Sequence, residues 1–281
     1  MRDPAEFEIT TASPGEMPLF RDWANAEGWN QGLRDMTAFH AADPRGFFLG
    51  RLDGEPVAAV SAVRYGEHHG FLGFYLTRPS ARGLGYGTRL RRTALAHLAG
   101  RTLALDGVLP QQDSYARSGF RRAWTHVRYE GTVSGGGPAA GVELVDGRLL
   151  PFGLTADLDR RFFPAPRDAF LSLWTGLPGH RCLAAVRDGR PDGFAVARPA
   201  EHGTRVGPLY AASPDVALSL LNGLATGRHV ALDVPDVNAA AVRLVEELGF
   251  AATFACARMY AGPVPDVDID GVFANTTLEL G

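Results

Sequence analysis

Phe71-Leu72-Gly73-Phe74-Tyr75-Leu76 is an apolar run that Pro79 closes, and the segment Arg82-Gly83-Leu84-Gly85-Tyr86-Gly87 follows it. The run predicts a buried strand, and the apolar spacing over residues 88–98 predicts an amphipathic helix. Three glycines in five residues allow successive N–H groups to point into one concavity, beside a helix N-terminus that favours negative charge. The segment therefore predicts a pyrophosphate cradle between a strand and a helix.

This cradle differs from two common phosphate-binding motifs. A dinucleotide fingerprint has its strand run straight into G-x-G-x-x-G, and a Walker loop needs a lysine. The chain contains no lysine, because all 28 basic residues are arginine, and this also excludes Schiff-base and pyridoxal-phosphate chemistry. An ordinary glycine turn before a helix is the alternative interpretation.

Composition indicates a globular protein with room for two domains. The 281 residues are 46% hydrophobic and 21% charged, and the net charge of −3 gives no general reason to expect nucleic acid or an anionic membrane as a partner. Cys182 and Cys256 are too few for a disulfide framework or a zinc site, so no metal is expected, and Cys256, in an apolar stretch, is expected to be a small core side chain. Acidic residues stand at the N-terminus and no apolar run reaches membrane-spanning length, which predicts a cytoplasmic protein.

Landmarks in the first part of the chain recur roughly 130 residues later, as expected for two copies of one fold. The pairs are Gly73 with Gly207, the hairpin turn Asp53-Gly54 with Asp188-Gly189, Leu105-Asp106 with Leu232-Asp233, and Gly119-Phe120 with Gly249-Phe250. We therefore expect a first domain over residues 1–131, a glycine-rich linker over 132–140, and a second domain over 141–281 whose tail begins at Pro263. The tail is expected to pack Phe273, Leu278 and Leu280 on one of the domains. The order of hairpins, strands and helices in each copy predicts an α/β (α+β) fold with a mixed, largely antiparallel sheet flanked by helices.

The order R-x-x-G-x-G after a strand that ends in x-x-Pro resembles the acetyl-coenzyme A signature of the GNAT acetyltransferase superfamily. The whole chain is similar to bacterial tandem GNAT proteins whose second half is an atypical acetyltransferase-like domain. This resemblance implies acetyl-CoA as cosubstrate. It implies a donor site formed by Tyr75, Leu76, Thr77, Arg82, Gly83, Leu84, Gly85, Tyr86, Gly87 and Thr88.

The same resemblance implies that Tyr115 is the general acid, because Tyr115-Ala116-Arg117-Ser118-Gly119-Phe120 places a tyrosine shortly before a Gly-Phe pair. A tyrosine with only a packing role is the alternative. In the second copy Val245 stands where Tyr115 stands in the first. There Ser213-Pro214-Asp215 predicts a capped helix start, with Ser213 as the N-cap and Pro214 at the first helical position, but the loop has no glycine. We therefore expect the second half not to bind acetyl-CoA.

The acceptor site and the general base are less well marked. Trp29, Asn30, Gln111 and Gln112 are candidate contacts to the acceptor, with a core anchor as the alternative for Trp29. The turn residues Glu67, His68 and His69 and the strand residue Asp106 are candidate bases. A polar turn is the favoured explanation for the first three, and the counterpart Asp233 in the second half indicates a structural role for Asp106, so no base is assigned.

The sequence thus predicts an N-acetyltransferase that acts on the primary amine of a small polar molecule, by direct attack in a ternary complex. A coenzyme A-binding sensor or scaffold without transfer is the first alternative, and acetylation of a protein amine is the second. A homodimer is left open.

Overall fold

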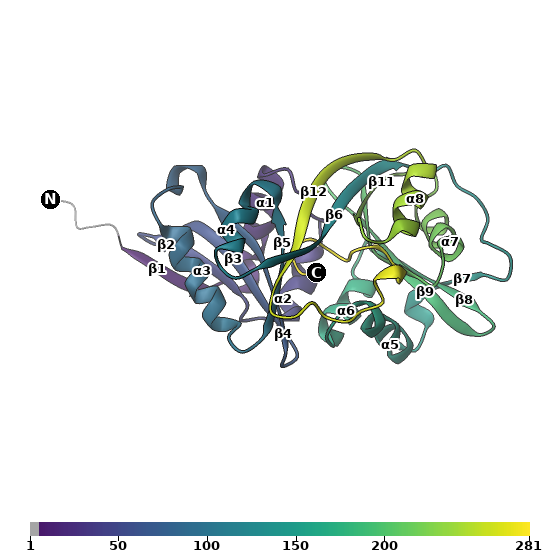
Figure 1. Ribbon diagram of the computed structural model, residues 1–281, viewed down its shortest axis with the longest axis horizontal. Coiled ribbons are helices and arrows are strands. Elements are labelled where there is room, and N and C mark those ends of the chain that lie inside the picture. The colour runs from purple at the N-terminus through teal and green to yellow at the C-terminus, as the bar shows by residue number, and fades with distance from the viewer. Residues whose placement is uncertain (1–5) are drawn as a thin grey trace.

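One thirteen-stranded sheet runs through both halves of the protein in the computed structural model, which describes residues 6–281 (Figure 1). The strands follow the order β1-β2-β3-β4-β5-β12-β6-β11-β10-β9-β8-β7, and β13 pairs with β10. Only β4–β5 and β10–β11 are parallel, while the remaining pairs are antiparallel. The predicted mixed, largely antiparallel fold is confirmed.

The strands of the first half are β1 (Phe7–Thr11), β2 (Phe47–Leu52), β3 (Glu55–Tyr65), β4 (His69–Thr77), β5 (Thr102–Val108) and β6 (Arg121–Thr132). Those of the second half are β7 (Glu143–Asp146), β8 (Arg181–Arg187), β9 (Arg190–Pro199), β10 (Thr204–Ala211), β11 (His229–Pro235), β12 (Ala251–Ala261) and β13 (Val272–Ala274). The helices are α1 (Met17–Ala26), α2 (Asp35–Ala42), α3 (Tyr86–His97), α4 (Gln112–Ala116), α5 (Phe152–Phe162), α6 (Asp168–Gly176), α7 (Pro214–Ala225) and α8 (Ala239–Glu247).

Local sequence explains several of these elements. The turns Asp53-Gly54 and Asp188-Gly189 have positive φ at both residues, as a tight hairpin requires, and they join β2 to β3 and β8 to β9. Helix α7 begins after Ser213, whose hydroxyl accepts a hydrogen bond from the Val216 N–H at 3.4 Å, as the capping signal predicted. Both hairpins and the helix are confirmed.

Alternating side chains of the first-half strands build two layers. Phe48 and Val60 face α3, whereas Phe47 and Leu49 pack with α1 and α2 on the opposite face. The second half repeats this plan, with α7 on one face and α5 and α6 on the other. Because Phe39 of α2 stacks on Trp174 of α6 at 5.9 Å between ring centroids, one hydrophobic core is continuous across both halves.

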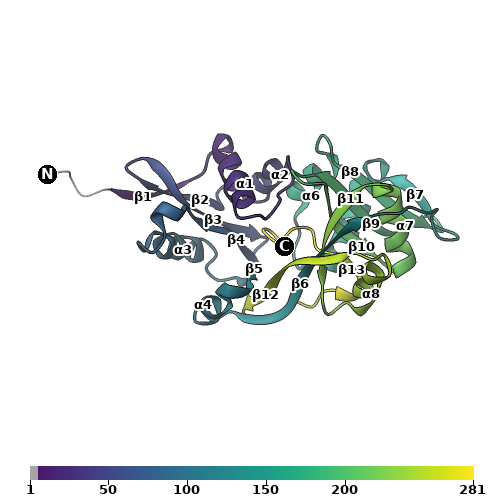
Figure 2. The same cartoon turned by 90° about the horizontal axis from the view of Figure 1, so that it is seen from above.

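The two halves exchange their last long strands. Strand β12 of the second half lies between β5 and β6, and β6 of the first half lies between β12 and β11 (Figures 1 and 2). Each half therefore completes its sheet with a strand from the other half. The boundary predicted at residues 132–140 separates the halves in sequence but not in the sheet. That segment is irregular and mostly exposed, yet Val133 is buried and the Ala139 N–H donates to Ser219.

A buried ion pair marks each exchanged strand. Arg258 of β12 lies opposite Asp106 of β5 and donates two hydrogen bonds to its carboxylate, both at 2.8 Å. In the other half, Arg128 of β6 lies opposite Asp233 of β11 and donates to it at 2.8 and 3.3 Å. Both carboxyl groups are buried, which would raise their pKa, but the facing arginines overcome this effect and hold each pKa below its usual value. Asp106 and Asp233 are therefore ionised partners in equivalent positions.

The segment after β12 connects the two halves once more. Strand β13 pairs with β10, and residues 275–281 continue from there to the middle of the molecule (Figure 2). The predicted packing of Phe273, Leu278 and Leu280 is confirmed, because all three are buried. The tail contacts both halves rather than one of them, since Tyr65 donates its hydroxyl hydrogen to the Leu280 carbonyl at 3.0 Å.

Candidate active site

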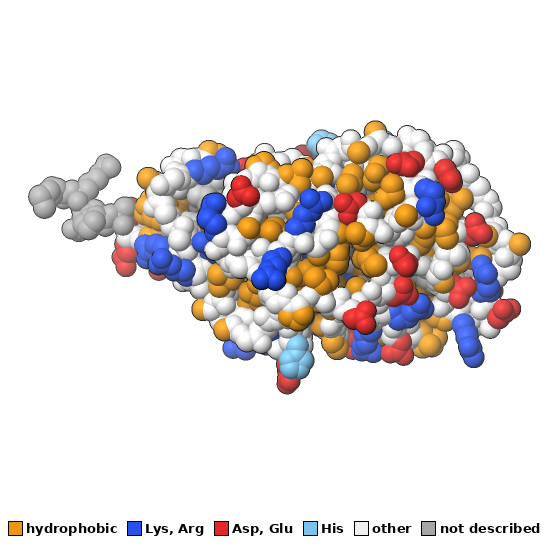
Figure 3. Space-filling model, in the orientation of Figure 1, with side chains coloured by type: hydrophobic (Ala, Val, Ile, Leu, Met, Phe, Trp, Pro, Cys, Tyr) orange, Lys and Arg blue, Asp and Glu red, His pale blue; other side chains and the backbone are white. Residues whose placement is uncertain are grey.

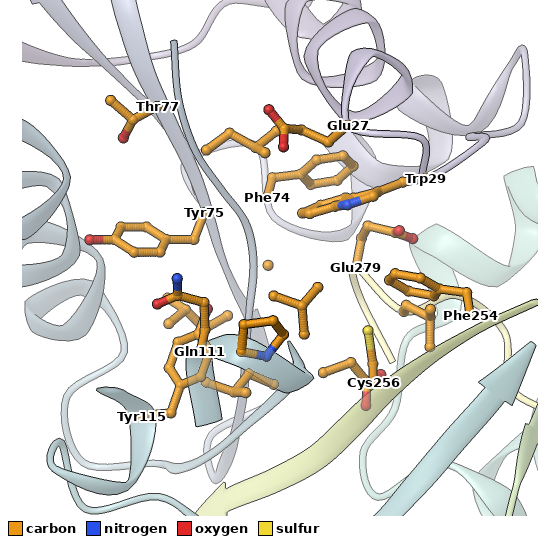
Figure 4. A pocket seen from close by; sticks show the side chains of 18 of the residues that line it. Glu27, Trp29, Phe74, Tyr75, Thr77, Gln111, Tyr115, Phe254, Cys256 and Glu279 are labelled. Atoms are coloured by element: carbon orange, nitrogen blue, oxygen red, sulfur yellow. The ribbon is translucent and has the colours of Figure 1, made fainter. Parts of the chain in front are cut away.

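A cavity of about 570 Å³ opens where β4 and β5 separate. The two strands pair from His69–Thr102 to Leu72–Leu105, after which the pairing stops. Phe74, at φ +45°, and a register shift between β3 and β4 mark the same point. The wall of the cavity comes from the segment after α1, from β4 and the start of the glycine loop, from β5, the turn before α4 and Tyr115, and from β6, β12 and the tail (Figure 4).

The glycine loop leads from the end of β4 into α3. Gly83 and Gly85 have φ values of +78° and +84° with open space around their α-carbons, so side chains there would be strained. Gly87 is needed for a different reason, because a Cβ atom would lie 2.8 Å from the Tyr75 hydroxyl oxygen. No side chain caps the first turn of α3, which leaves its N–H groups available to an anion. The geometry fits a bound pyrophosphate.

The other predicted donor residues lie around this loop. The Arg82 guanidinium donates to the Thr77 carbonyl at 3.0 Å and also contacts the carboxylate of Glu27, and all three residues line the cavity. Tyr75 and Leu76 line it as well, and the Tyr75 ring points toward α3 (Figure 4). Leu84 and Thr88 are exposed and Tyr86 is half-buried against Phe7.

Tyr115 lies in α4 and lines the cavity. Its ring packs edge-on against Phe120 at 6.3 Å, and a Cβ atom on Gly107 would lie 2.8 Å from it, so the ring is held closely. Within residues 6–281 no group hydrogen-bonds to the Tyr115 hydroxyl. Burial, with a smaller contribution from Tyr75, raises the pKa of Tyr115 to about 12. The phenol is therefore protonated at neutral pH and has a proton to donate into the cavity.

Two of the four predicted acceptor contacts lie in the wall. Trp29 lines the cavity and also packs against Phe74, with 6.4 Å between ring centroids, so it has features of both an acceptor contact and a core anchor. Gln111 lines the opposite side of the cavity (Figure 4). Asn30 is placed elsewhere, because its amide exchanges hydrogen bonds with the backbone of His202 at 2.8 and 3.0 Å and so ties the halves together. Gln112 is not part of the wall either, since it begins α4 one residue beyond Gln111.

The predicted base candidates do not face the cavity as free groups. Asp106 reaches the wall, but Arg258 and His126 occupy its carboxylate. Glu67 and His68 lie in the exposed turn at the other end of β4. His69 is buried there against Phe163, and burial, with nearby Arg258, lowers its pKa to about 4.

The wall residues on the exchanged strands and on the tail were missed in the sequence: Arg128, Phe254, Cys256, Leu278 and Glu279. The sequence repeat places each of these segments in the half of the chain to which it belongs, so it gives no sign that they meet at one cavity. Cys256 was expected to be a core residue. It is buried, and its sulfur also faces the cavity in Figure 4. Burial raises the pKa of its thiol, which keeps the sulfur protonated.

The equivalent opening in the second half is filled by the tail. Strands β10 and β11 pair only from Thr204–Val230 to Val206–Leu232. Beyond that point β13 pairs with β10, and the Asn275 N–H donates to the Asp233 carbonyl of β11 at 2.8 Å. At Gly207 a Cβ atom would lie 2.4 Å from the Asn275 carbonyl oxygen. The tail thus occupies the space that corresponds to the first-half cavity.

The comparisons with known proteins agree with this architecture. Residues 15–120 match the model of the acetyltransferase (GNAT) family, and residues 155–274 match that of an acetyltransferase (GNAT) domain. The chain is 34% identical over 290 residues to a holothin acyltransferase from Pseudoalteromonas sp. (strain SANK 73390), covering 98% of this chain and 96% of that protein.

Two solved structures share the fold. A proposed acetyltransferase from Pyrococcus horikoshii superposes with a TM-score of 0.82 at 22% identity, covering 98% of this chain and 96% of the other. A tandem GNAT protein from the clavulanic acid biosynthesis pathway gives a TM-score of 0.64 at 18% identity, covering 92% and 100%. The fold and the cavity define a tandem GNAT protein with an open site in its first half. The chain belongs to the GNAT acyltransferases.

Other features of the described residues bear on the predicted partners. No helix within residues 6–281 is long and apolar enough to cross a membrane. In the same residues no group of three or more His, Cys, Asp or Glu side chains is placed to hold a metal. Acidic and basic side chains both occur along the face shown in Figure 3. The predictions on nucleic acid and on a homodimer stay predictions.

Proposed function

We propose that the first half transfers an acetyl group from acetyl-CoA to the primary amine of a small molecule, in the cytoplasm. The observation that carries this proposal is that the predicted donor loop and the predicted general acid meet at the same cavity. Arg82, at the start of the glycine loop that leads into the uncapped α3, lines the same cavity as Tyr115, whose raised pKa keeps its phenol protonated. Acetyl-CoA supplies an activated thioester, and Arg82 with the α3 N–H groups would hold its phosphates.

The chain's own residues account for the rest of the reaction. The β4 backbone from Phe74 to Thr77 lacks a neighbouring strand on the cavity side, so its polar groups can align the donor arm. Tyr115 would give its proton to the departing thiolate sulfur and regain one from solvent. Direct attack by the amine needs no covalent enzyme intermediate.

The wall of the cavity suggests the nature of the acceptor. Beyond the donor loop it is largely apolar, with Trp29, Phe74, Phe254 and Leu278 as its larger side chains. This favours a compact amine with an apolar body, which modifies the small polar molecule expected from sequence. Holothin is a reasonable first candidate because a relative that matches nearly the whole chain is named for it.

The two alternatives make different demands on the same site. A coenzyme A sensor would need no proton donor, and the placement of Tyr115 in the wall favours the enzyme. A protein acetyltransferase would need an open groove for a peptide. The cavity is closed on one side by the tail, which favours a small acceptor.

The test is acetyl transfer by the purified protein to holothin, 2-phenylethylamine, spermidine and an N-terminal peptide, followed by release of the coenzyme A thiol. We expect turnover with at least one of the first two amines. Tyr115→Phe should lower kcat by about 10²–10⁴-fold with unchanged acetyl-CoA affinity. Tyr129→Phe, on β6 outside the cavity wall, is the matched control and should retain full activity. Acetyl-CoA binding without transfer to any amine would support the sensor instead.

A further inference from the structure

We propose that Glu279, which the tail of the second half carries into the first-half cavity, is the catalytic residue that accepts the proton of the acceptor amine. This inference rests on the proposed function. It deepens that function by assigning the base that the sequence left open, and it gives the second half a direct part in the reaction.

Glu279 differs from the other carboxylates of the cavity wall. Three acidic residues line it: Glu27, Asp106 and Glu279. Arg82 contacts Glu27, and Arg258 holds Asp106 through two hydrogen bonds. Among residues 6–281 the Glu279 carboxylate has a neutral partner only, the side-chain amide of Gln31 at 2.6 Å. It is thus the one acidic group of this wall without an arginine ion pair in the described chain.

The position of Glu279 is fixed by its backbone. Its carbonyl oxygen lies against Gly73, where a Cβ atom would come within 2.1 Å. The adjacent Leu280 donates its N–H to the Thr277 hydroxyl at 3.0 Å and accepts from Tyr65 at 3.0 Å. The tail is therefore packed against the point where β4 separates from β5. The side chain lies between Trp29 and Phe254 in Figure 4, at the end of the cavity away from Tyr75.

The surroundings suit a base for an amine. Burial raises the pKa of Glu279, while the charges of Arg205 on β10 and Arg128 on β6 oppose that rise without cancelling it. Asp233 on β11 adds a negative charge to the same cluster, and the neighbouring Cys256 on β12 is a neutral thiol. A carboxylate with a raised pKa takes a proton from an ammonium ion more readily than an ordinary one does.

The step balances as follows. The acceptor enters as an ammonium ion, and Glu279 takes one of its protons to leave a neutral amine. The nitrogen lone pair forms the new C–N bond, the C–S bond breaks, and its electron pair leaves with the sulfur, which takes the Tyr115 proton. The second nitrogen proton passes to solvent, and Glu279 and Tyr115 return to their starting states by exchange with water. The net products are the amide, the coenzyme A thiol and one proton.

The experiment compares Glu279→Gln, Glu279→Asp and the control Glu67→Gln with the wild-type protein, using holothin and 2-phenylethylamine as acceptors. Glu67 is an exposed acidic residue in the turn before β4 and serves as a matched carboxylate outside the cavity. Calorimetric titration with acetyl-CoA and thermal melting accompany the kinetics, so that loss of the fold or of the donor site is recognised.

We expect kcat/KM of the wild type and of Glu67→Gln to fall toward low pH as Glu279 becomes protonated. Glu279→Gln should lose about 10²–10⁴-fold in kcat, keep its acetyl-CoA affinity and lose this acidic limb. Glu279→Asp should recover part of the activity with the limb restored. If Glu279→Gln were as active as the wild type, or were slower but kept the acidic limb, Glu279 would not be the base, while the proposed function would still stand. No turnover by the wild type with either amine would overturn the proposed function and this inference together.

Discussion

The two halves of the protein have the same order of elements and the same separation of two parallel strands, but they use that separation differently. Between β4 and β5 it holds an open cavity next to an uncapped, glycine-rich helix start. Between β10 and β11 it holds the tail, and the helix that follows is capped by Ser213. One fold can thus provide a ligand site or a groove for part of its own chain.

The glycines at the two openings show how the halves are connected. Gly73 and Gly207 occupy equivalent places, and each lies directly against the backbone of the tail, at Glu279 and at Asn275 respectively. The tail fills the second opening and then supplies part of the wall of the first. The second half is therefore best understood as a structural component of the first-half site, which explains why it can lack both the glycine loop and the tyrosine.

The ion pairs at the exchanged strands give the largest expected effect on stability. Arg258→Met should lower the free energy of unfolding by about 3–5 kcal/mol, because it leaves the buried Asp106 without its arginine. Arg128→Met should cost less, since Arg205 also contacts Asp233. Denaturant unfolding of both variants checks this order. Equal losses of unfolding free energy in the two variants would contradict the proposed difference between the two ion pairs. The double variant Arg258→Met/Asp106→Leu should recover much of the stability lost in Arg258→Met.

A smaller effect concerns pH and the buried histidines. The pKa of His69 is lowered to about 4 in the folded protein by burial, with Arg258 as a further cause, against 6.5 for the ordinary group. The unfolded chain therefore binds the proton first, and stability should fall as pH drops from 6.5 toward 4, by at most about 3 kcal/mol. His69→Leu should flatten this part of the stability curve in denaturant unfolding.

His180 in the second half gives the matched comparison for that pH effect. Its pKa is also lowered, with burial as the main cause, but its ring nitrogen has a hydrogen-bond partner in the Trp174 carbonyl at 2.8 Å. His69 has no partner for Nδ1 within the described residues. Replacement of His180 should therefore change stability at all pH values, because it removes a buried hydrogen bond. An unchanged pH dependence in His69→Leu would contradict the assignment to His69.

The smallest expected effect on stability comes from the two glycines that face the tail. Gly73→Ala and Gly207→Ala should each cost about 1–3 kcal/mol, because the added methyl group meets backbone oxygen atoms that cannot rotate away. They should differ in function. Gly73→Ala displaces Glu279 directly and should lower acetyl transfer, whereas Gly207→Ala acts at a distance and should mainly lower the melting temperature. If both variants lost the same acetyl-transfer activity for a given loss of stability, the proposed functional difference between the two openings would be contradicted.

Much of this arrangement could be predicted from sequence because it depends on local signals. The glycine loop, both Asp-Gly hairpins and the Ser213 cap each need only a few adjacent residues, and all appear where expected. The position of Tyr115 in the cavity wall could be predicted because only a short segment separates it from β5. The pairing of Asp106 and Asp233 in the repeat also indicated their structural role, which the matching arginine pairs explain.

The strand exchange and the tail could not be predicted because they depend on long-range pairing. Strands β6 and β12 have similar sequence patterns, so either could complete either half. As a result Phe254 and Glu279 had no signal that placed them beside Trp29. Asn30 was predicted as an acceptor contact because of its neighbours in sequence, but its amide bonds to His202 of the other half.

The most direct test of the comparison between the two openings is a calorimetric titration with acetyl-CoA, carried out on the wild type and on Gly85→Val. The account predicts one site per chain in the wild type. It predicts loss of that site in the variant, since valine is strained at φ +84° and would crowd the phosphate cradle. Two sites per chain, or a single site that Gly85→Val leaves unchanged, would show that the second half binds the donor and would contradict the account.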